Sequence, residues 1–319
     1  MSRTWTGMIP VTKRKLISIP AGTALVLLAV LLAGSLFSFS CAPAPRPPAG
    51  PGDPGDSGKP PAGKQPELRA FFINVGQGDS CLIMARTGSG EEFTLLVDAG
   101  PAGASEGVVE FLREAGVTEI DYLVFTHPHE DHIGGGKAVL DAFEVGKVYM
   151  PKTSHTTGAY EQLLLTIESK GLTVTQVRAG KVILEEKDFE VEFLGPVKSY
   201  EDLNDCSAVM SLTFGKKVLL LMGDAEAQAE KDMLEAGIVP DADVLKVGHH
   251  GASTSTSGEF LKVSRPSVAV ISVGPNPYGH PSKTVLDRLE RAGVKVYRTD
   301  LHGTVEVVIK GDRLDVSTR

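Results

Sequence analysis

The sequence predicts a layered α/β domain over residues 68–319. Two observations support this fold class. Short runs rich in Val, Ile, Leu and Phe recur along this stretch, and each is bounded by Gly, Pro or Asp, which is typical of strands. Between some of these runs lie segments whose apolar residues recur every three to four positions, the pattern of amphipathic helices. Strands and helices mixed over about 250 residues favour stacked layers of sheet and helix.

The predicted elements can be placed in order along the chain. Strands are expected at 68–75, 93–100, 121–127, 146–150, 189–196, 208–215, 217–224, 242–250, 267–274 and 305–310. Helices, each ending at a glycine, are expected at 106–116, 159–171, 226–237 and 283–293. Residues 212–224 have the pattern of a β-hairpin with a Gly-Lys turn. The chain shows no repeat at a fixed period.

Residues 1–40 predict a signal peptide or a membrane anchor. Four basic residues precede an apolar run at 21–39, and no acid occurs before Asp53. A basic segment followed by an apolar one is typical of export signals, and these 19 residues are also long enough to span a bilayer as a helix. Cys41 follows Ser40, an ending that resembles the lipidation site of bacterial lipoproteins. A lipoprotein is favoured over an uncleaved anchor or plain secretion, and all three place the domain outside the cytoplasm.

Residues 41–67 predict a Pro/Gly-rich tether. They hold nine of the 20 prolines of the chain. Such a segment buries too little apolar surface to offset the entropy of ordering it, and its prolines keep it semi-extended. We expect it to act as a spacer between the membrane and the domain at 68–319.

Charge and cysteine content limit the function classes. Residues 1–67 hold seven of the 32 basic and three of the 40 acidic residues, which leaves a net charge of −12 for residues 68–319. A general nucleic-acid binder is basic, so this class is excluded unless metal ions or a local basic strip offset the charge at a site. Beyond Cys41 only Cys81 and Cys206 remain, too few for a disulfide scaffold. The two could pair outside the cytoplasm, but small buried residues are favoured.

Residues that can bind metal ions follow the ends of predicted strands. Asp98, His127 and Asp224 each come at the end of an apolar run, and His249 and His250 follow another. Ligands of open α/β sheets bind at the carboxyl ends of the strands. We therefore expect these side chains to converge.

The segment "HPHEDH" at 127–132 is the densest group of candidate ligands. Imidazole and carboxylate side chains together suit Zn²⁺, Mn²⁺ or Fe. Its two leading histidines and the Asp-His pair that follows offer too many ligands for one tetrahedral ion, so they predict two adjacent ions. Asp224 is available as a shared carboxylate, and His249 or His250 as a further ligand.

The same segment resembles the His-x-His-x-Asp-His signature of the metallo-β-lactamase superfamily. Further motifs, in this order, resemble the extracytoplasmic hydrolase-like domain of the competence protein ComEC and its stand-alone relatives: "NVGQGDS" (74–80), "NDCSAVM" (204–210), "LLLMGDAE" (219–226), "DVLKVGHHGASTSTS" (243–257), "YGHP" (278–281) and "VYRTDLHG" (296–303). The resemblance covers about residues 68–312. It implies a four-layer αββα sandwich with a metal site on one edge.

The resemblance also implies a role for each matching residue. Two divalent metal ions, Zn or Mn, would be held by His127 and His129 at the first site, by Asp131, His132 and His249 at the second, and by Asp224 between them. His250 is the alternative to His249. Asp98 would orient a ligand imidazole, as metal sites generally require.

One departure from the superfamily pattern puts the first site in question. Many of these hydrolases place a third histidine between the first motif and the bridging aspartate, but the interval 133–223 holds only His155, whose context does not match. Asn204 or Asp205 could replace that imidazole, and harder oxygen ligands would favour Mn²⁺. Three more residues are candidates for contacts with the metal ligands or the substrate: Ser207, Ser253 and His280.

The predicted activity is hydrolysis by a metal-activated water. Two adjacent ions lower the pKa of a bound water to about 7 and hold the attacking and leaving oxygens, which suits attack on phosphorus or on an activated carbonyl. Asp131 would orient the hydroxide or accept its proton as the catalytic residue. A phosphodiesterase or nuclease is favoured, with DNA or a smaller phosphodiester as substrate. The alternatives are a hydrolase of lactams, lactones or thioesters, and a tethered binding protein without turnover; we expect a monomer.

Overall fold

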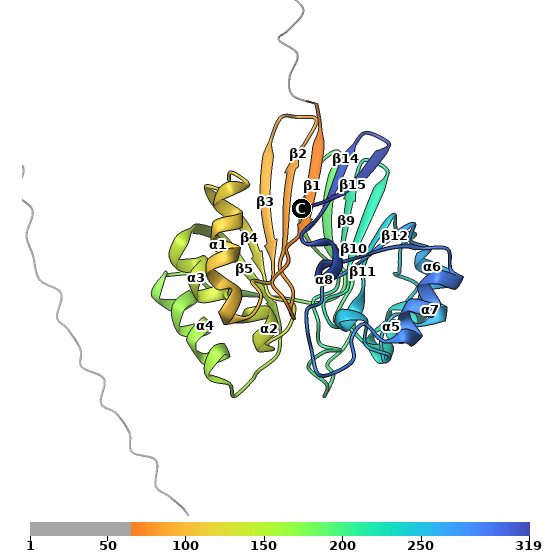
Figure 1. Ribbon diagram of the computed structural model, residues 1–319. Coiled ribbons are helices and arrows are strands. Elements are labelled where there is room, and N and C mark those ends of the chain that lie inside the picture. The colour runs from red at the N-terminus through yellow and green to blue at the C-terminus, as the bar shows by residue number, and fades with distance from the viewer. Residues whose placement is uncertain (1–64) are drawn as a thin grey trace, which may run out of the picture. The chain divides into compact units, whose positions relative to one another are not determined.

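The computed structural model describes residues 65–319, which form two β-sheets flanked by helices (Figure 1). Its first strand begins at Glu67, one residue before the predicted start of the domain. The signal peptide or anchor at 1–40, lipidation at Cys41 and nearly all of the tether at 41–67 lie outside the described residues and stay predictions. Within 65–319, no helix combines the length and apolar character needed to cross a membrane.

The first sheet has eight strands in the order β15-β14-β1-β2-β3-β4-β5-β6. Their bounds are β1 Glu67–Phe72, β2 Cys81–Arg86, β3 Glu92–Val97, β4 Glu119–Val124, β5 Glu144–Pro151, β6 Val174–Val177, β14 Val305–Lys310 and β15 Arg313–Thr318. Strands β3 to β6 run parallel, while β15, β14, β1, β2 and β3 pair antiparallel. The carboxyl ends of β3 to β6 therefore lie at one edge of this sheet.

The second sheet has seven strands in the order β13-β12-β11-β10-β9-β8-β7. Their bounds are β7 Lys181–Glu185, β8 Phe189–Phe193, β9 Met210–Phe214, β10 Lys217–Leu221, β11 Val244–Lys246, β12 Val268–Ile271 and β13 Lys295–Arg298. Strands β10 to β13 run parallel, and β7 to β10 pair antiparallel. The carboxyl ends of β10 and β11 thus also share one edge.

Within residues 65–319, eight α-helices lie between the strands. They are α1 Ser105–Glu114, α2 Glu130–Ile133, α3 Gly136–Ala142, α4 Gly158–Ser169, α5 Ala227–Glu235, α6 Gly258–Ser264, α7 Lys283–Arg291 and α8 Thr299–His302. The hydroxyls of Thr157, Ser257 and Ser282 accept a backbone N–H at the starts of α4, α6 and α7. Such caps satisfy N–H groups that have no partner inside the helix, which fixes where these three helices begin.

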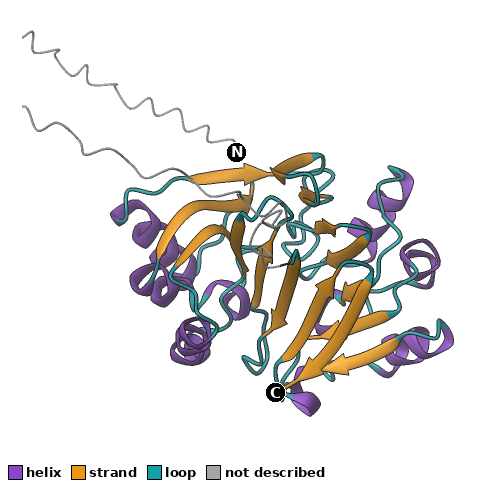
Figure 2. Ribbon diagram, turned by 90° about the horizontal axis from the view of Figure 1, so that it is seen from above, coloured by secondary structure: helices purple, strands orange, loops and turns teal. Residues whose placement is uncertain are grey.

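Three clusters of buried apolar side chains join the layers. Between the sheets, Phe72 and Val97 share one cluster with Leu212 of the second sheet. A second cluster packs α1, α3 and α4 on the outer face of the first sheet, and a third packs α5, α6 and α7 on the second. Figure 2 shows helices on both flanks with the strands between them. The predicted αββα sandwich is confirmed.

Most predicted elements are confirmed, and the differences follow a pattern. The hairpin at 212–224 forms, with Lys217 opposite Phe214 across the Gly-Lys turn. The four helices predicted by periodicity are α1, α4, α5 and α7. Strands β6, β7, β13 and β15 were not predicted, and all four are edge strands. The central strand β2 and the short helices α2, α3, α6 and α8 were also not predicted.

The two cysteines within residues 65–319 are free and buried. Cys81 begins β2, and Cys206 lies in the loop before β9. The prediction that they are small buried residues is confirmed. Burial raises the pKa of both thiols, which keeps them protonated and poor nucleophiles.

Candidate metal centre

The site forms where the carboxyl ends of strands from both sheets meet. Asp98 directly follows β3 of the first sheet, and three more residues each come three positions after a strand: His127 after β4, Asp224 after β10 and His249 after β11. The loop after β4 joins the second sheet directly, because the carbonyl of Thr126 accepts the N–H of Ala208 at 2.9 Å. The predicted convergence of these strand ends is therefore present.

Local backbone geometry directs the side chains of the "HPHEDH" segment toward the second sheet. His129 precedes α2 in an extended conformation, and α2 then carries Asp131 and His132 toward the second sheet. The segment is pinned by the N–H of Asp79, which donates to the carbonyl of Asp131 at 3.1 Å. Gly78, with φ of +140°, makes this approach sterically allowed, since a Cβ there would collide with that carbonyl.

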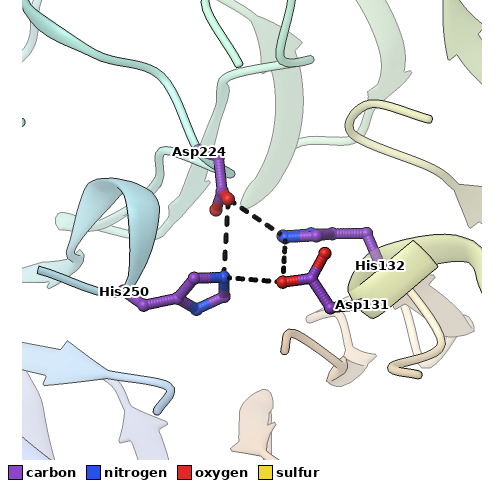
Figure 3. A group of neighbouring side chains, drawn as sticks. All are labelled: Asp131, His132, Asp224 and His250. Atoms are coloured by element: carbon purple, nitrogen blue, oxygen red, sulfur yellow. Dashed lines mark ion pairs between the residues drawn. The ribbon is translucent and has the colours of Figure 1, made fainter. Parts of the chain in front are cut away.

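Four side chains form a compact cluster, shown in Figure 3: Asp131, His132, Asp224 and His250. Their ligand atoms all lie within 4.8 Å of one another. The Nε2 of His132 is 3.3 Å from Asp224 Oδ2, and the Nε2 of His250 is 3.4 Å from the same oxygen. The Nε2 of His250 also lies 3.2 Å from Asp131 Oδ2. Two imidazoles and two carboxylates thus face a common point.

Several atoms of this cluster are buried without a hydrogen-bond partner among residues 65–319: Nε2 of His132, Nε2 of His250 and Oδ1 of Asp224. Buried polar groups are normally hydrogen-bonded, so atoms without partners that face one another need another explanation. Imidazole nitrogen and carboxylate oxygen are the donors that Zn²⁺ and Mn²⁺ take in proteins. The residues present therefore fit a divalent metal ion.

A single oxygen, Asp224 Oδ2, is the centre of the whole site. Besides His132 and His250, the Nε2 atoms of His127 and His249 approach it, each at 3.8 Å. Four imidazole nitrogens therefore face one carboxylate oxygen.

His129 lies on the side of His127. Its Nδ1 is 2.9 Å from the Nε2 of His127, and the two ring centroids are 4.6 Å apart. His129 is partly exposed while His127 is fully buried. The two histidines implied for the first ion thus lie together at the more open end of the cluster.

The adjacent histidines 249 and 250 contact different groups. Both have a left-handed backbone, with φ of 45° and 51°, in the 3₁₀ turn Gly248–Gly251. His250 is buried and its Nδ1 donates to the carbonyl of Ser272 at 2.8 Å, which directs Nε2 to Asp131. The Nδ1 of His249 instead lies 2.6 Å from Glu226 Oε1. The geometry therefore favours His250, the alternative left open by the sequence, as the histidine beside Asp131.

Asp98 holds His132 in place, as the resemblance implied. Its Oδ2 is 2.8 Å from the Nδ1 of His132, so the opposite nitrogen of that ring points to Asp224. The carboxylate also accepts the N–H and the hydroxyl of Thr126 at 2.8 and 2.7 Å. Burial raises the pKa of Asp98, although the neighbouring His132 opposes that rise.

The buried charges of the cluster shift one another's pKa. Burial alone would lower the pKa of His132, but Asp224 and Asp98 hold it well above its usual value. Burial is likewise outweighed at His250, whose pKa rises to about 10 beside Asp224 and Asp131. The pKa of Asp224 is held well below its usual value by His132 and His250, against the effect of its burial. A divalent cation would take the place of these imidazole protons, because metal-bound imidazoles are neutral.

Comparison with protein families agrees with this geometry. The model of the metallo-beta-lactamase superfamily matches residues 74–274, which include every member of the cluster. The chain belongs to the metallo-beta-lactamase superfamily.

Known relatives extend the match to ComEC-type competence proteins, as the sequence motifs predicted. The chain is 32% identical over 253 residues to ComE operon protein 3 of Bacillus subtilis (strain 168) and 33% identical over 253 residues to competence protein ComA of Neisseria gonorrhoeae. The alignments cover 74% and 78% of this chain, and the chain spans about a third (32% and 33%) of these relatives. Among solved structures, the metallo-beta-lactamase fold protein YhfI from Bacillus subtilis aligns with 75% of this chain and 99% of its own at 14% identity and a TM-score of 0.49.

The loop at 204–207 has a different role from the one that the sequence suggested for it. Asp205 Oδ1 accepts the N–H groups of Glu226 and Ala229 at 3.0 and 3.1 Å, at the start of α5. This carboxylate therefore caps a helix, and it is not part of a metal-competent cluster of His, Cys, Asp and Glu within residues 65–319. Asn204 as a metal ligand stays a prediction. Ser207 does contact a candidate ligand, since its Oγ accepts the N–H of Asp224 at 3.0 Å.

Two charged residues beneath the cluster were missed by the sequence analysis. Lys246 is 3% exposed, pairs with Asp79 and donates to the carbonyl of Gly223 at 3.1 Å. Asp79 in turn lies 3.5 Å from the Nδ1 of His250. Burial would lower the pKa of Lys246, but Asp79 and Asp224 raise it above its usual value, so the amine stays charged. A lysine inside the apolar run of β11 was the signal that could have identified Lys246 as a buried charge, although not its partner.

The remaining sequence candidates lie at the rim. The ring centroid of His280 is 5.2 Å from that of His249, and its backbone N–H donates to Asn276 Oδ1 at 3.1 Å. Ser253 is exposed, and its carbonyl accepts Arg288 Nη1 at 3.4 Å. A substrate contact for either residue stays a prediction.

Proposed function

We propose that this domain is a metal-dependent phosphodiesterase with two divalent ions, Zn or Mn, on either side of Asp224. The observation that carries the proposal is the approach of four imidazole Nε2 atoms to one oxygen of this carboxylate. A site for one ion needs no such excess of donors, because a tetrahedral ion takes four ligands. Membership of a superfamily of metal-dependent hydrolases supports the same reading.

The chain's own residues divide into two ligand sets. The second set is Asp131, His132 and His250, with Asp224 shared. The first set is His127, His129 and, in place of the missing third histidine, His249. The position of His249 supports this assignment, because its Nε2 and the Nε2 of His127 both lie 3.8 Å from Asp224 Oδ2. Glu226 fixes its opposite ring nitrogen at 2.6 Å.

Two ions bound there would supply a water of lowered pKa and stabilise charge on the attacking and leaving oxygens. Among the four residues of the cluster, Asp131 alone is not buried, with 31% of its side chain exposed. It therefore faces the side from which a substrate arrives. Its position suits a carboxylate that orients the attacking water and accepts its proton.

The site's location on the cell is part of the same proposal. The basic and apolar pattern of residues 1–40, the lipidation signal at Cys41 and the tether to residue 67 support a domain held outside the cytoplasm at a bacterial membrane. One relative is named a ComE operon protein and another a competence protein. These names support an extracytoplasmic phosphodiester as substrate, with DNA among the candidates.

Hydrolysis of bis-p-nitrophenyl phosphate tests the proposed activity. The full chain, supplied separately with Mn²⁺ and Zn²⁺, is expected to hydrolyse it, and the His129→Ala variant is expected to lose at least about 100-fold in kcat/KM because a preorganised ligand is gone. His302→Ala is the matched control, since this exposed histidine bonds only locally to Arg298. No turnover with either ion would reject a phosphodiesterase, and turnover of a lactam or thioester instead would favour the carbonyl hydrolase.

A further inference from the structure

A cavity of about 710 Å³ has four cations and no carboxylate among its lining residues. We call it the basic groove, after its four charged residues: Lys152, Arg178, Lys181 and Lys198. The net charge of residues 68–319 is −12, so this concentration of positive charge is local and runs against the charge of the domain. A cleft lined by one sign of charge attracts ligands of the opposite sign.

Most of these charges are available to a ligand. Within residues 65–319, Lys152, Arg178 and Lys181 form no ion pair, and only Lys198 is paired, with Asp232 at 2.8 Å. Lys152 and Arg178 are exposed. An anion that enters the groove could therefore bind three of the four cations without displacing an existing partner.

A second cavity lined by cations, of about 590 Å³ between α6 and α7, differs in this respect. There Arg265 pairs with Asp241, and Arg291 lies 3.8 Å from Asp287. Arg288 donates to the backbone carbonyl of Ser255 at 3.0 Å. The guanidinium groups of that cavity are already bound to partners within the protein. The cavity is therefore a suitable internal control.

The basic groove lies at the same edge of the first sheet as the metal centre. Lys152 and Arg178 directly follow β5 and β6, which run parallel to β4 and so end at the same edge as His127. The loop that starts at Lys152 contains His155, whose ring centroid lies 5.8 Å from that of His129. On the other side the groove is lined by Cys206, the neighbour of the serine that contacts Asp224.

We propose that the basic groove binds the phosphates of a single-stranded nucleic acid next to the phosphodiester that is cleaved. This inference rests on the proposed function for the position of the cleaved bond, but binding itself needs no turnover. Metal ions at the centre would neutralise the charge of a single phosphodiester, whereas four cations gathered in a neighbouring groove match additional phosphates of a longer substrate. Cations confined to a groove, with Tyr200 in its wall, suit a single strand rather than the broad face of a duplex.

Binding of a short fluorescein-labelled oligothymidylate by the full chain in EDTA tests the inference without hydrolysis. The Lys152→Glu/Arg178→Glu variant is expected to bind at least about tenfold more weakly. The slope of log affinity against log salt is expected to fall by about 1.4, for two lost contacts with a single strand. The variant Lys262→Glu/Arg265→Glu, which makes the same charge change at the second cavity, should bind as the wild type does.

Hydrolysis provides the second measurement. The groove variant should keep the wild-type kcat/KM for bis-p-nitrophenyl phosphate, because that substrate does not reach the groove. Two results would overturn the inference. One is a loss of bis-p-nitrophenyl phosphate hydrolysis as large as the loss of oligothymidylate binding, and the other is unchanged oligothymidylate binding. Stronger displacement by poly(glycerol phosphate) than by unlabelled oligothymidylate would also overturn it, in favour of a wall polymer. Oligothymidylate binding that depends on Lys152 and Arg178 in a protein without phosphodiesterase activity would support the groove and reject only the proposed function.

Discussion

The Asp224→Asn variant is expected to lose hydrolysis by at least about 10³-fold, because it removes the one carboxylate that both ligand sets share. The amide cannot supply a negative charge to two cations, and its neutral oxygen faces the same four imidazoles. We expect metal content, measured by inductively coupled plasma mass spectrometry, to fall from two ions per chain to one or none. This readout does not depend on choosing the right substrate.

A matched variant separates the loss of the bridge from a general effect of removing an acid. Asp287→Asn removes a carboxylate that pairs with Lys283 and Arg291 on the surface of α7, so metal content and hydrolysis should stay at the wild-type level. Wild-type metal content in Asp224→Asn would contradict the assignment of this residue as a bridge. Circular dichroism of the two variants establishes that both are folded.

The Lys246→Met variant is expected to lose about 3–5 kcal/mol in its free energy of unfolding, since Asp79 is then buried without its cation. Lys246 is 3% exposed and Asp79 is 5% exposed, so water cannot replace the lost partner. Urea denaturation measures the loss. Metal affinity should fall as well, because Asp79 contacts the Nδ1 side of His250.

A second substitution distinguishes the effect of losing the ion pair from the effect of losing the packing of the Lys246 side chain. The double variant Lys246→Met/Asp79→Leu replaces both charges by apolar side chains, which is often neutral for stability, so most of the lost free energy should return. A double variant as unstable as Lys246→Met would mean that packing rather than charge accounts for the effect. A loss below about 1 kcal/mol in Lys246→Met would contradict a buried ion pair.

The sequence predicted every inner strand of the two sheets except β2, because those strands are rich in apolar residues. Four of the five unpredicted strands, β6, β7, β13 and β15, are the outer strands of the two sheets. An edge strand has one unpaired side and keeps polar side chains there, so its apolar pattern is weak; β15, "RLDVST", has no buried residue. The fifth, β2 with the sequence "CLIMAR", is central and apolar, and the sequence analysis missed it even though its pattern is that of a strand.

Candidate ligands could be predicted from position, but their individual contacts could not. His249 and His250 both follow β11, and the hydrogen bond from the Nδ1 of His250 to the carbonyl of Ser272 directs the second of them to Asp131. Asp205 looked as suitable a ligand as any acid, yet the first N–H groups of α5 take its oxygen. The Lys246–Asp79 pair joins distant segments, so either residue alone gave no sign of the other.

Anomalous X-ray diffraction from crystals of the Mn²⁺-loaded protein would test the central claim most directly. The account predicts two manganese peaks per chain, one beside His127 and His129 and one beside His132 and His250, with Asp224 between them. A single peak, or peaks away from Asp224, would contradict a shared carboxylate and with it the proposed two-metal hydrolase.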